Sequence, residues 1–227
     1  MAMWNPWRGC HKYSGGCRFC YIHKGDARRG VDTNVVEKTD NFFAPLERYK
    51  RGEKKDEYKM KSGETVYLCF SSDFLLPDAD EWRDECWGIM RERVDLYFLF
   101  LTKRIKRFMD CIPDDRSNGF ENVTVGCTAE NQAEADKRLS LFDTLPIKHK
   151  NIILQPMLEK MDIERHLNGV ELVVVGGEST ATQGPWTTHG CWMFGSNACG
   201  RARSLNFASA AVILSRTASC ISSMSAS

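Results

Sequence analysis

The chain has 227 residues, of which 42% are apolar, so it is long enough to bury the core of a single α/β domain. A formal charge of +1 and a pI near 7.5 exclude a strong whole-molecule attraction to nucleic acid or anionic membranes. No apolar run approaches the roughly 18 residues that span a bilayer, and the N-terminus lacks the features of a signal peptide. We therefore expect a cytoplasmic protein without a membrane partner.

Three of the ten cysteines lie close together near the N-terminus, in the stretch WNPWRGCHKYSGGCRFCYIH from Trp4 to His23. They are Cys10, Cys17 and Cys20. Three thiolates on one glycine-containing loop are typical of a disulfide, of a zinc site short of one ligand, or of an iron-sulfur cluster with one open iron. His11 or His23 would complete a zinc site, whereas a reducing compartment disfavours the disulfide.

Residues 42–64, FFAPLERYKRGEKKDEYKMKSGE, change from a short apolar opening to dense charge. We expect a surface helix and loop here, because alternating Lys and Glu usually form a solvated face. Binding of phosphate groups, as in a nucleic acid, by the basic stretch from Arg48 to Lys61 is the alternative.

From Thr65 onward, short apolar runs alternate with helical stretches, one of them around Asp80 to Val94. The runs are VYLCFSSD, DLYFLFLTKR, NVTVGCTAEN, NIILQPMLE and ELVVVGGES. Such runs are typical of strands buried on both faces, and the helices between them indicate βαβ units. With a short strand before Cys10, the pattern predicts an α/β fold, a partial (β/α)6-type open barrel with about six parallel strands. Cys69 and Cys127 are expected in its core.

Each predicted strand ends in polar or glycine residues. They are Ser71, Ser72 and Asp73; Thr102, Lys103 and Arg104; Thr128, Glu130 and Asn131; Gln155 and Glu159; and Gly176, Gly177 and Glu178. Ligands of parallel α/β folds bind at this edge, although some of these residues are expected to serve only as turn or helix-cap residues. The three cysteines follow the first strand, so we expect them on the same face.

The composition changes near residue 180. All acidic residues lie at or before Glu178, and the only charged residues from Thr180 onward are Arg201, Arg203 and Arg216. No helical apolar period follows the last predicted strand. When the possible codons for Thr182 to Arg201 are read in a shifted frame, they permit a peptide that has this helical period. We expect residues 1–179 to form the fold and 180–227 to be a frame-shifted, non-native tail; a native disordered tail is the alternative.

The Cys-x2-Cys pair with Phe19 before its second cysteine resembles the cluster loop of radical S-adenosylmethionine enzymes. The usual first gap is three residues, whereas this chain has six between Cys10 and Cys17. With WNPWRGC, SSDFL, LTKR, GCTAEN and VVVGGES, the loop resembles a phage- and bacteria-associated family of radical-SAM-like proteins of unknown function. That family is more distantly similar to spore photoproduct lyase, and the resemblance covers about residues 4–179.

The resemblance implies a 4Fe-4S cluster on the three cysteines, with S-adenosylmethionine at its open iron. An external donor would supply the electron that cleaves this cofactor, giving a 5′-deoxyadenosyl radical that attacks an unknown substrate. The implied cofactor contacts are Ser72 and Asp73 at the amino group, Glu130 and Asn131 toward the ribose, and Gly176 and Gly177 by close backbone approach, with Glu178 beside them. Phe19 and Tyr21 would pack near the adenine or, alternatively, in the core. Lys103 and Arg104 are candidates for contact with the substrate or with the cofactor carboxylate. The competing interpretation is a non-catalytic zinc or iron-sulfur phage accessory protein that contacts nucleic acid.

Overall fold

The computed structural model describes residues 2–114, 119–177 and 212–215, and its central element is a seven-stranded sheet. In spatial order the strands are β1 (Ala2–Trp4), β4 (Thr65–Leu68), β5 (Tyr97–Thr102), β6 (Val123–Thr128), β7 (His149–Leu154), β8 (Val170–Val175) and β9 (Val212–Ser215). The first six pair in parallel, and β9 is antiparallel to β8. The sheet does not close into a barrel, so the predicted open α/β fold with six parallel strands is confirmed.

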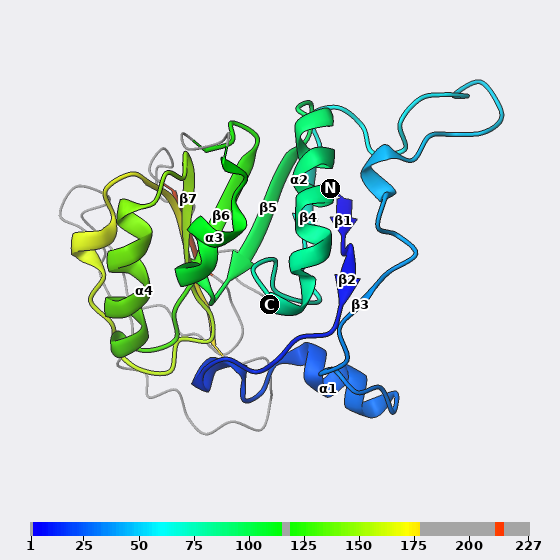
Figure 1. Ribbon diagram of the computed structural model, residues 1–227. Helices are drawn as coiled ribbons and strands as arrows, with labels where there is room; N and C mark the ends of the chain where they lie inside the picture. Colours follow the sequence, from blue (N-terminus) through cyan, green and yellow to red (C-terminus); the bar gives the residue numbers. More distant parts are fainter. Residues whose placement is uncertain (1, 115–118, 178–211, 216–227) are drawn as a thin grey trace, which may run out of the picture.

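The helices of the described chain lie in the connections between strands and at the cysteine-bearing segment. They are α1 (Tyr21–Arg28), α2 (Asp80–Glu92), α3 (Phe108–Cys111) and α4 (Gln132–Thr144), with 3-10 turns η1 (Gly15–Cys17), η2 (Ala44–Leu46), η3 (Pro77–Ala79), η4 (Ile105–Arg107) and η6 (Glu164–His166). Because successive strands of the parallel sheet are neighbours, right-handed crossovers place their helices on one side. Figure 1 shows α2, α3 and α4 over the same face of the sheet. The helix predicted around Asp80 to Val94 is α2.

Burial within β5 explains why the strands lack polar alternation. Phe98 and Phe100 are buried under the helices, whereas Leu99 and Leu101 on the opposite face are half-buried. The far face of β5 is thus only partly covered, whereas β6 and β7 are buried on both faces, with Thr128 and Ile153 buried on the side away from the helices. The prediction of burial on both faces is therefore right for the central strands β6 and β7 and only partly right for β5. Cys69 and Cys127 are buried, as predicted.

Residues 47–59 form a projecting hairpin, here called the arm, rather than the predicted surface helix (Figure 1). Its strands meet at the bridge between Arg48 and Tyr58, and the Tyr49 N–H donates to the carbonyl of Glu57 at 3.0 Å. The Tyr58 ring contacts the guanidinium groups of Arg48 and Arg93 at 3.8 and 3.9 Å. The helix prediction was wrong because this charged segment offers no apolar stripe for a helix to bury.

A second, two-stranded sheet positions the cysteines. Strand β2 (Trp7–Arg8) pairs antiparallel with β3 (Glu37–Lys38), and the buried Trp7 ring stacks on Phe74 at 5.5 Å. The intervening residues 9–36 carry all three clustered cysteines and α1. In Figure 1 this segment crosses beyond the lower ends of the strands, which are their carboxyl ends. The cysteines therefore lie on the predicted face of the fold.

No helix among the described residues is long and apolar enough to cross a membrane. The predictions for Glu178 and for the tail 180–227 fall outside the described residues, apart from the β9 segment.

Candidate functional site

Accessibility separates the three clustered cysteines from the other described cysteines. Cys10, Cys17 and Cys20 are free and half-buried. The other described cysteines are free but buried; they are Cys69, Cys86, Cys111 and Cys127. Burial, and after it the Asp73 carboxylate, raises the pKa of Cys10 to about 12. The loop of residues 9–20, here called the cysteine loop, thus carries the accessible thiols of the described chain.

The three thiols do not form a ready-made metal site. Cys10 lies before the η1 turn, Cys17 ends that turn, and Cys20 is the N-cap of α1. Nowhere in residues 2–114, 119–177 and 212–215 do three His, Cys, Asp or Glu side chains gather closely enough to hold a metal ion. The donor types fit an iron-sulfur cluster, since all three are free thiols on one short loop. Binding one would require the loop to draw its sulfurs together.

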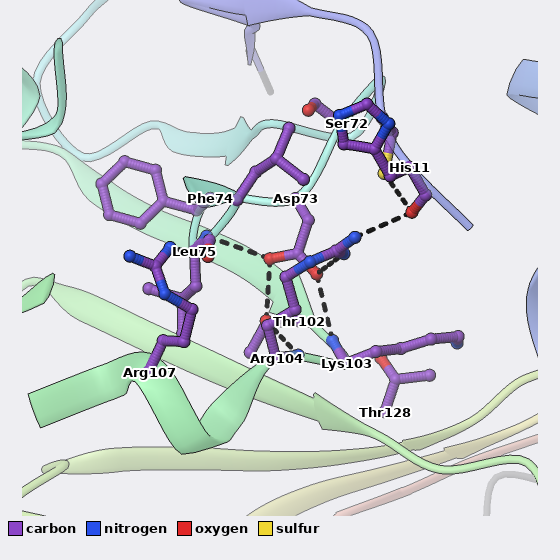
Figure 2. A network of polar contacts seen from close by, with 12 residues as sticks. His11, Ser72, Asp73, Phe74, Leu75, Thr102, Lys103, Arg104, Arg107 and Thr128 are labelled. Atoms are coloured by element: carbon purple, nitrogen blue, oxygen red, sulfur yellow. Dashed lines mark hydrogen bonds and ion pairs between the residues drawn. The ribbon is translucent and has the colours of Figure 1, made fainter. Parts of the chain in front are cut away.

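A buried ion pair between Asp73 and Arg104 anchors the first part of the cysteine loop (Figure 2). Arg104 Nη1 lies 3.1 Å from Asp73 Oδ2, and Arg104 Nη2 donates to the carbonyl oxygen of His11 at 2.7 Å. Asp73 also accepts from the Thr102 hydroxyl at 2.8 Å and from the backbone N–H of Lys103 at 3.2 Å. Two neighbouring strand ends, those of β4 and β5, are thereby joined to the loop.

A second buried ion pair, between Glu130 and Arg138, anchors the later part of the cysteine loop. Glu130 Oε2 lies 3.0 Å from Arg138 Nη1, and Glu130 Oε1 accepts from the Gly16 N–H at 3.2 Å. A Cβ atom on Gly16 would lie 3.1 Å from the Glu130 side chain, so this close approach favours glycine. Burial alone would raise the pKa of Glu130, but hydrogen bonds from the loop and the charges of Arg138 and Lys103 lower it below its usual value.

Tyr13 connects the two anchors. Its ring centroid lies 4.9 Å from the Arg104 guanidinium and 5.4 Å from that of Arg138. The cysteine loop is therefore attached to the sheet at His11, Tyr13 and Gly16, and all three contacts lie between Cys10 and Cys17.

Lys103 provides a cation at this edge that is not used in the anchors. Its backbone N–H donates to Asp73, but within the described chain its ammonium group makes no hydrogen bond or ion pair. Burial lowers the pKa of Lys103, against the opposing influence of Cys17 and Glu130. A half-buried ammonium beside Cys17 could bind an anionic group of a ligand.

The remaining predicted site residues make mainly structural contacts. The Ser72 hydroxyl donates to the carbonyl of Gly9, and Asn131 caps α4 by accepting from the Glu134 N–H at 2.8 Å. The Tyr21 hydroxyl donates to the carbonyl of Phe70, while the Phe19 ring contacts the cations of Arg18 and Lys24. Gly176 is buried against Gln155, Gly177 is exposed, and Glu159 accepts from the Gln132 N–H.

Sequence reasoning missed Tyr13, Gly16 and Arg138. Arg138 occupies a helix in which a basic residue is usually solvated, and its partner Glu130 lies beyond the helix start. No local pattern distinguishes it from a surface arginine.

A model of the DUF5131 family, described as a protein of unknown function, matches residues 1–207. No curated protein and no solved structure matches the chain.

Proposed function

We propose that this chain, which belongs to the DUF5131 family, is a radical S-adenosylmethionine-type enzyme that acts on an unidentified substrate with an external electron donor. One observation carries the proposal. Three accessible cysteines lie on a loop that two buried ion pairs attach to the carboxyl edge of a parallel sheet. Ligands of such sheets bind at that edge.

Cys10, Cys17 and Cys20 would hold a 4Fe-4S cluster through three of its irons. When bound, the cluster and S-adenosylmethionine would supply a 5′-deoxyadenosyl radical that takes hydrogen from the substrate. The residues of the chain would bind and orient the cluster, the cofactor and the substrate. Lys103 would pair with the cofactor carboxylate, because its ammonium has no partner among the described residues.

The two anchors refine the roles proposed for the acidic residues. Asp73 is surrounded by donors, and Glu130 is fully buried. Both carboxylates would therefore act through the cysteine loop, as positioning residues, and not by contact with the cofactor. Ser72, Asn131, Phe19, Tyr21, Gly176 and Gly177 stay predicted cofactor contacts.

Anaerobic reconstitution tests the proposal. We expect a brown protein with about four irons per chain, which forms 5′-deoxyadenosine when it is reduced with S-adenosylmethionine. Replacing Cys10, Cys17 and Cys20 together with alanine should remove the iron and the product. Cys111→Ala, which removes a thiol elsewhere, should retain both. A colourless protein with one tightly bound zinc, or iron retained by the triple variant, would contradict the proposal.

A second candidate function is nucleic-acid binding by the arm without catalysis. Four cations near the arm's tip make no ion pair within the described chain; they are Lys50, Arg51, Lys54 and Lys55. The arm projects from the end of the molecule opposite the cysteine loop (Figure 1), so this binding would be independent of the cysteines. Unpaired cations on a projecting hairpin are suited to phosphate groups.

Replacing these four cations with glutamine tests the second candidate. We expect the slope of log affinity against log salt concentration to become shallower by up to about 3.6 for duplex DNA, because each of the four lost phosphate contacts removes about 0.9. Fluorescence anisotropy with a labelled oligonucleotide measures it. The triple cysteine variant is the control and should bind as the wild type does. Unchanged binding by the arm variant would reject this function.

A further inference from the structure

A cavity of about 330 Å³ lies directly beside the cysteine loop. Tyr13, Ser14 and Gly15 form one wall, and these residues lie between Cys10 and Cys17. Glu130 and Asn131, which follow β6, form another part of the lining. The remaining walls come from η4 and α4, through the side chains of Lys106, Glu134, Lys137 and Arg138. Its volume is in the range of small-molecule sites.

The carboxylates in this cavity are already paired. Glu130 binds Arg138 and the Gly16 N–H, as described above. Glu134 lies 2.5 Å from Arg138 Nη2 and 3.2 Å from Lys137 Nζ. A ligand would therefore meet few free acceptors here.

Hydrogen-bond donors, in contrast, are in excess. Within the described chain Lys106 has no ion pair, and Lys137 has Glu134 as its acceptor. The Asn131 side chain caps α4 with its oxygen, which leaves its amide nitrogen as a donor. The buried Arg138 Nε has no acceptor among the described residues. The positive end of the α4 dipole lies at the same place, because Asn131 is its N-cap.

We propose that this cavity is a subsite that binds a phosphate group. Its donors come from several directions, as a phosphate with several acceptor oxygens requires, and among the described residues Tyr13 is the one aromatic side chain in its lining. That the phosphate belongs to the substrate rests on the proposed function, since the cavity shares Tyr13, Ser14 and Gly15 with the cysteine loop. The phosphate itself comes either from a small phosphate ester or from a nucleic-acid backbone.

Titration of metal-free protein with inorganic phosphate tests the subsite without a cluster. Calorimetry at constant ionic strength, with chloride as the reference anion, measures the affinity. We expect Lys106→Gln with Lys137→Gln to weaken phosphate binding at least about tenfold, because two charge-assisted donors are lost. Both lysines are exposed, so the fold should persist, and circular dichroism checks this. Lys148→Gln with Arg165→Gln removes the same charge outside the cavity lining and should leave phosphate affinity unchanged.

Competition experiments then identify the source of the phosphate. Displacement of phosphate by a nucleoside 5′-monophosphate, but not by the nucleoside, supports a small ester. Displacement by a short single-stranded oligonucleotide at lower concentration supports a nucleic-acid backbone. Equal phosphate affinity in the wild type and the Lys106/Lys137 variant would overturn the subsite. Competition by S-adenosylmethionine alone would overturn its assignment to the substrate. Failure of cluster assembly, by contrast, would leave phosphate binding by the metal-free protein intact.

Discussion

Replacing Arg104 with glutamine is expected to lower the free energy of unfolding by about 3–5 kcal/mol, because it leaves the buried Asp73 carboxylate without its charged partner. Both side chains of this pair are only 7% exposed, so water can replace little of the lost interaction. The variant also loses the hydrogen bond from Arg104 to the His11 carbonyl. We therefore expect urea unfolding at a lower midpoint, together with a loosened cysteine loop.

Tryptic cleavage after Lys12 and Arg18 measures the loosening in metal-free protein. Cleavage should be faster in the Arg104→Gln variant under conditions in which the fold is retained, because the His11 attachment lies beside the first of these sites. The iron content after reconstitution should fall as well. The proteolysis result does not depend on the cluster, so it tests the anchor separately from the proposed function.

The exposed ion pair between Arg165 and Asp136 provides the matched control. Its side chains are 63% and 46% exposed, so Arg165→Gln should cost less than about 1 kcal/mol. Combining Arg104→Gln with Asp73→Asn should recover part of the loss, because no unpaired charge then remains buried. If Arg104→Gln were as mild as Arg165→Gln, the anchor would not hold the loop.

The parallel sheet could be predicted from local sequence because its signal is local. Short apolar runs such as the one in β5 follow one another, α2 and α4 supply helices of crossover length between some of them, and successive parallel strands are neighbours in the sheet. The arm could not be predicted in the same way. It depends on the contact of Tyr58 with Arg93, a residue of another element 35 positions later. Alternating charge gives no sign of such a contact.

The site was predictable in position but not in detail. Strand-end reasoning predicts Asp73 and Glu130 at one edge of the sheet, where the structure has both in ion pairs, and their contact with a cofactor stays a prediction. It did not indicate that each carboxylate would bind an arginine and the cysteine loop. Arg138 is eight residues from Glu130, and Gly16 is 114 residues from it. Such partners are brought together only by the folded sheet, so their roles follow from the structure.

The backbone before Cys10 carries the other large expected effect, in the substitution Gly9→Ala. Gly9 has a φ of +90°, and a Cβ atom there would lie 2.2 Å from the carbonyl oxygen of Val35. The positive φ alone costs about 1–2 kcal/mol for a residue with a side chain. Displacing main-chain atoms adds about 1–3 kcal/mol, as in overpacked cores. We expect a loss of about 2–5 kcal/mol in chemical unfolding.

Because Gly9 directly precedes Cys10, the substitution should affect the candidate site as well as the stability of the fold. The Gly9 carbonyl accepts from Ser72, and the next residue, Cys10, donates its N–H to the Thr33 carbonyl at 2.8 Å. A shift of this backbone moves the first thiol relative to the sheet, so iron loading should fall along with stability. Gly25→Ala in α1 is the control, because no atom lies within 4 Å of its added Cβ. There alanine should stabilise by up to about 1 kcal/mol and leave iron loading unchanged. Equal stability and iron content in the two variants would show that the backbone at Gly9 does not position Cys10.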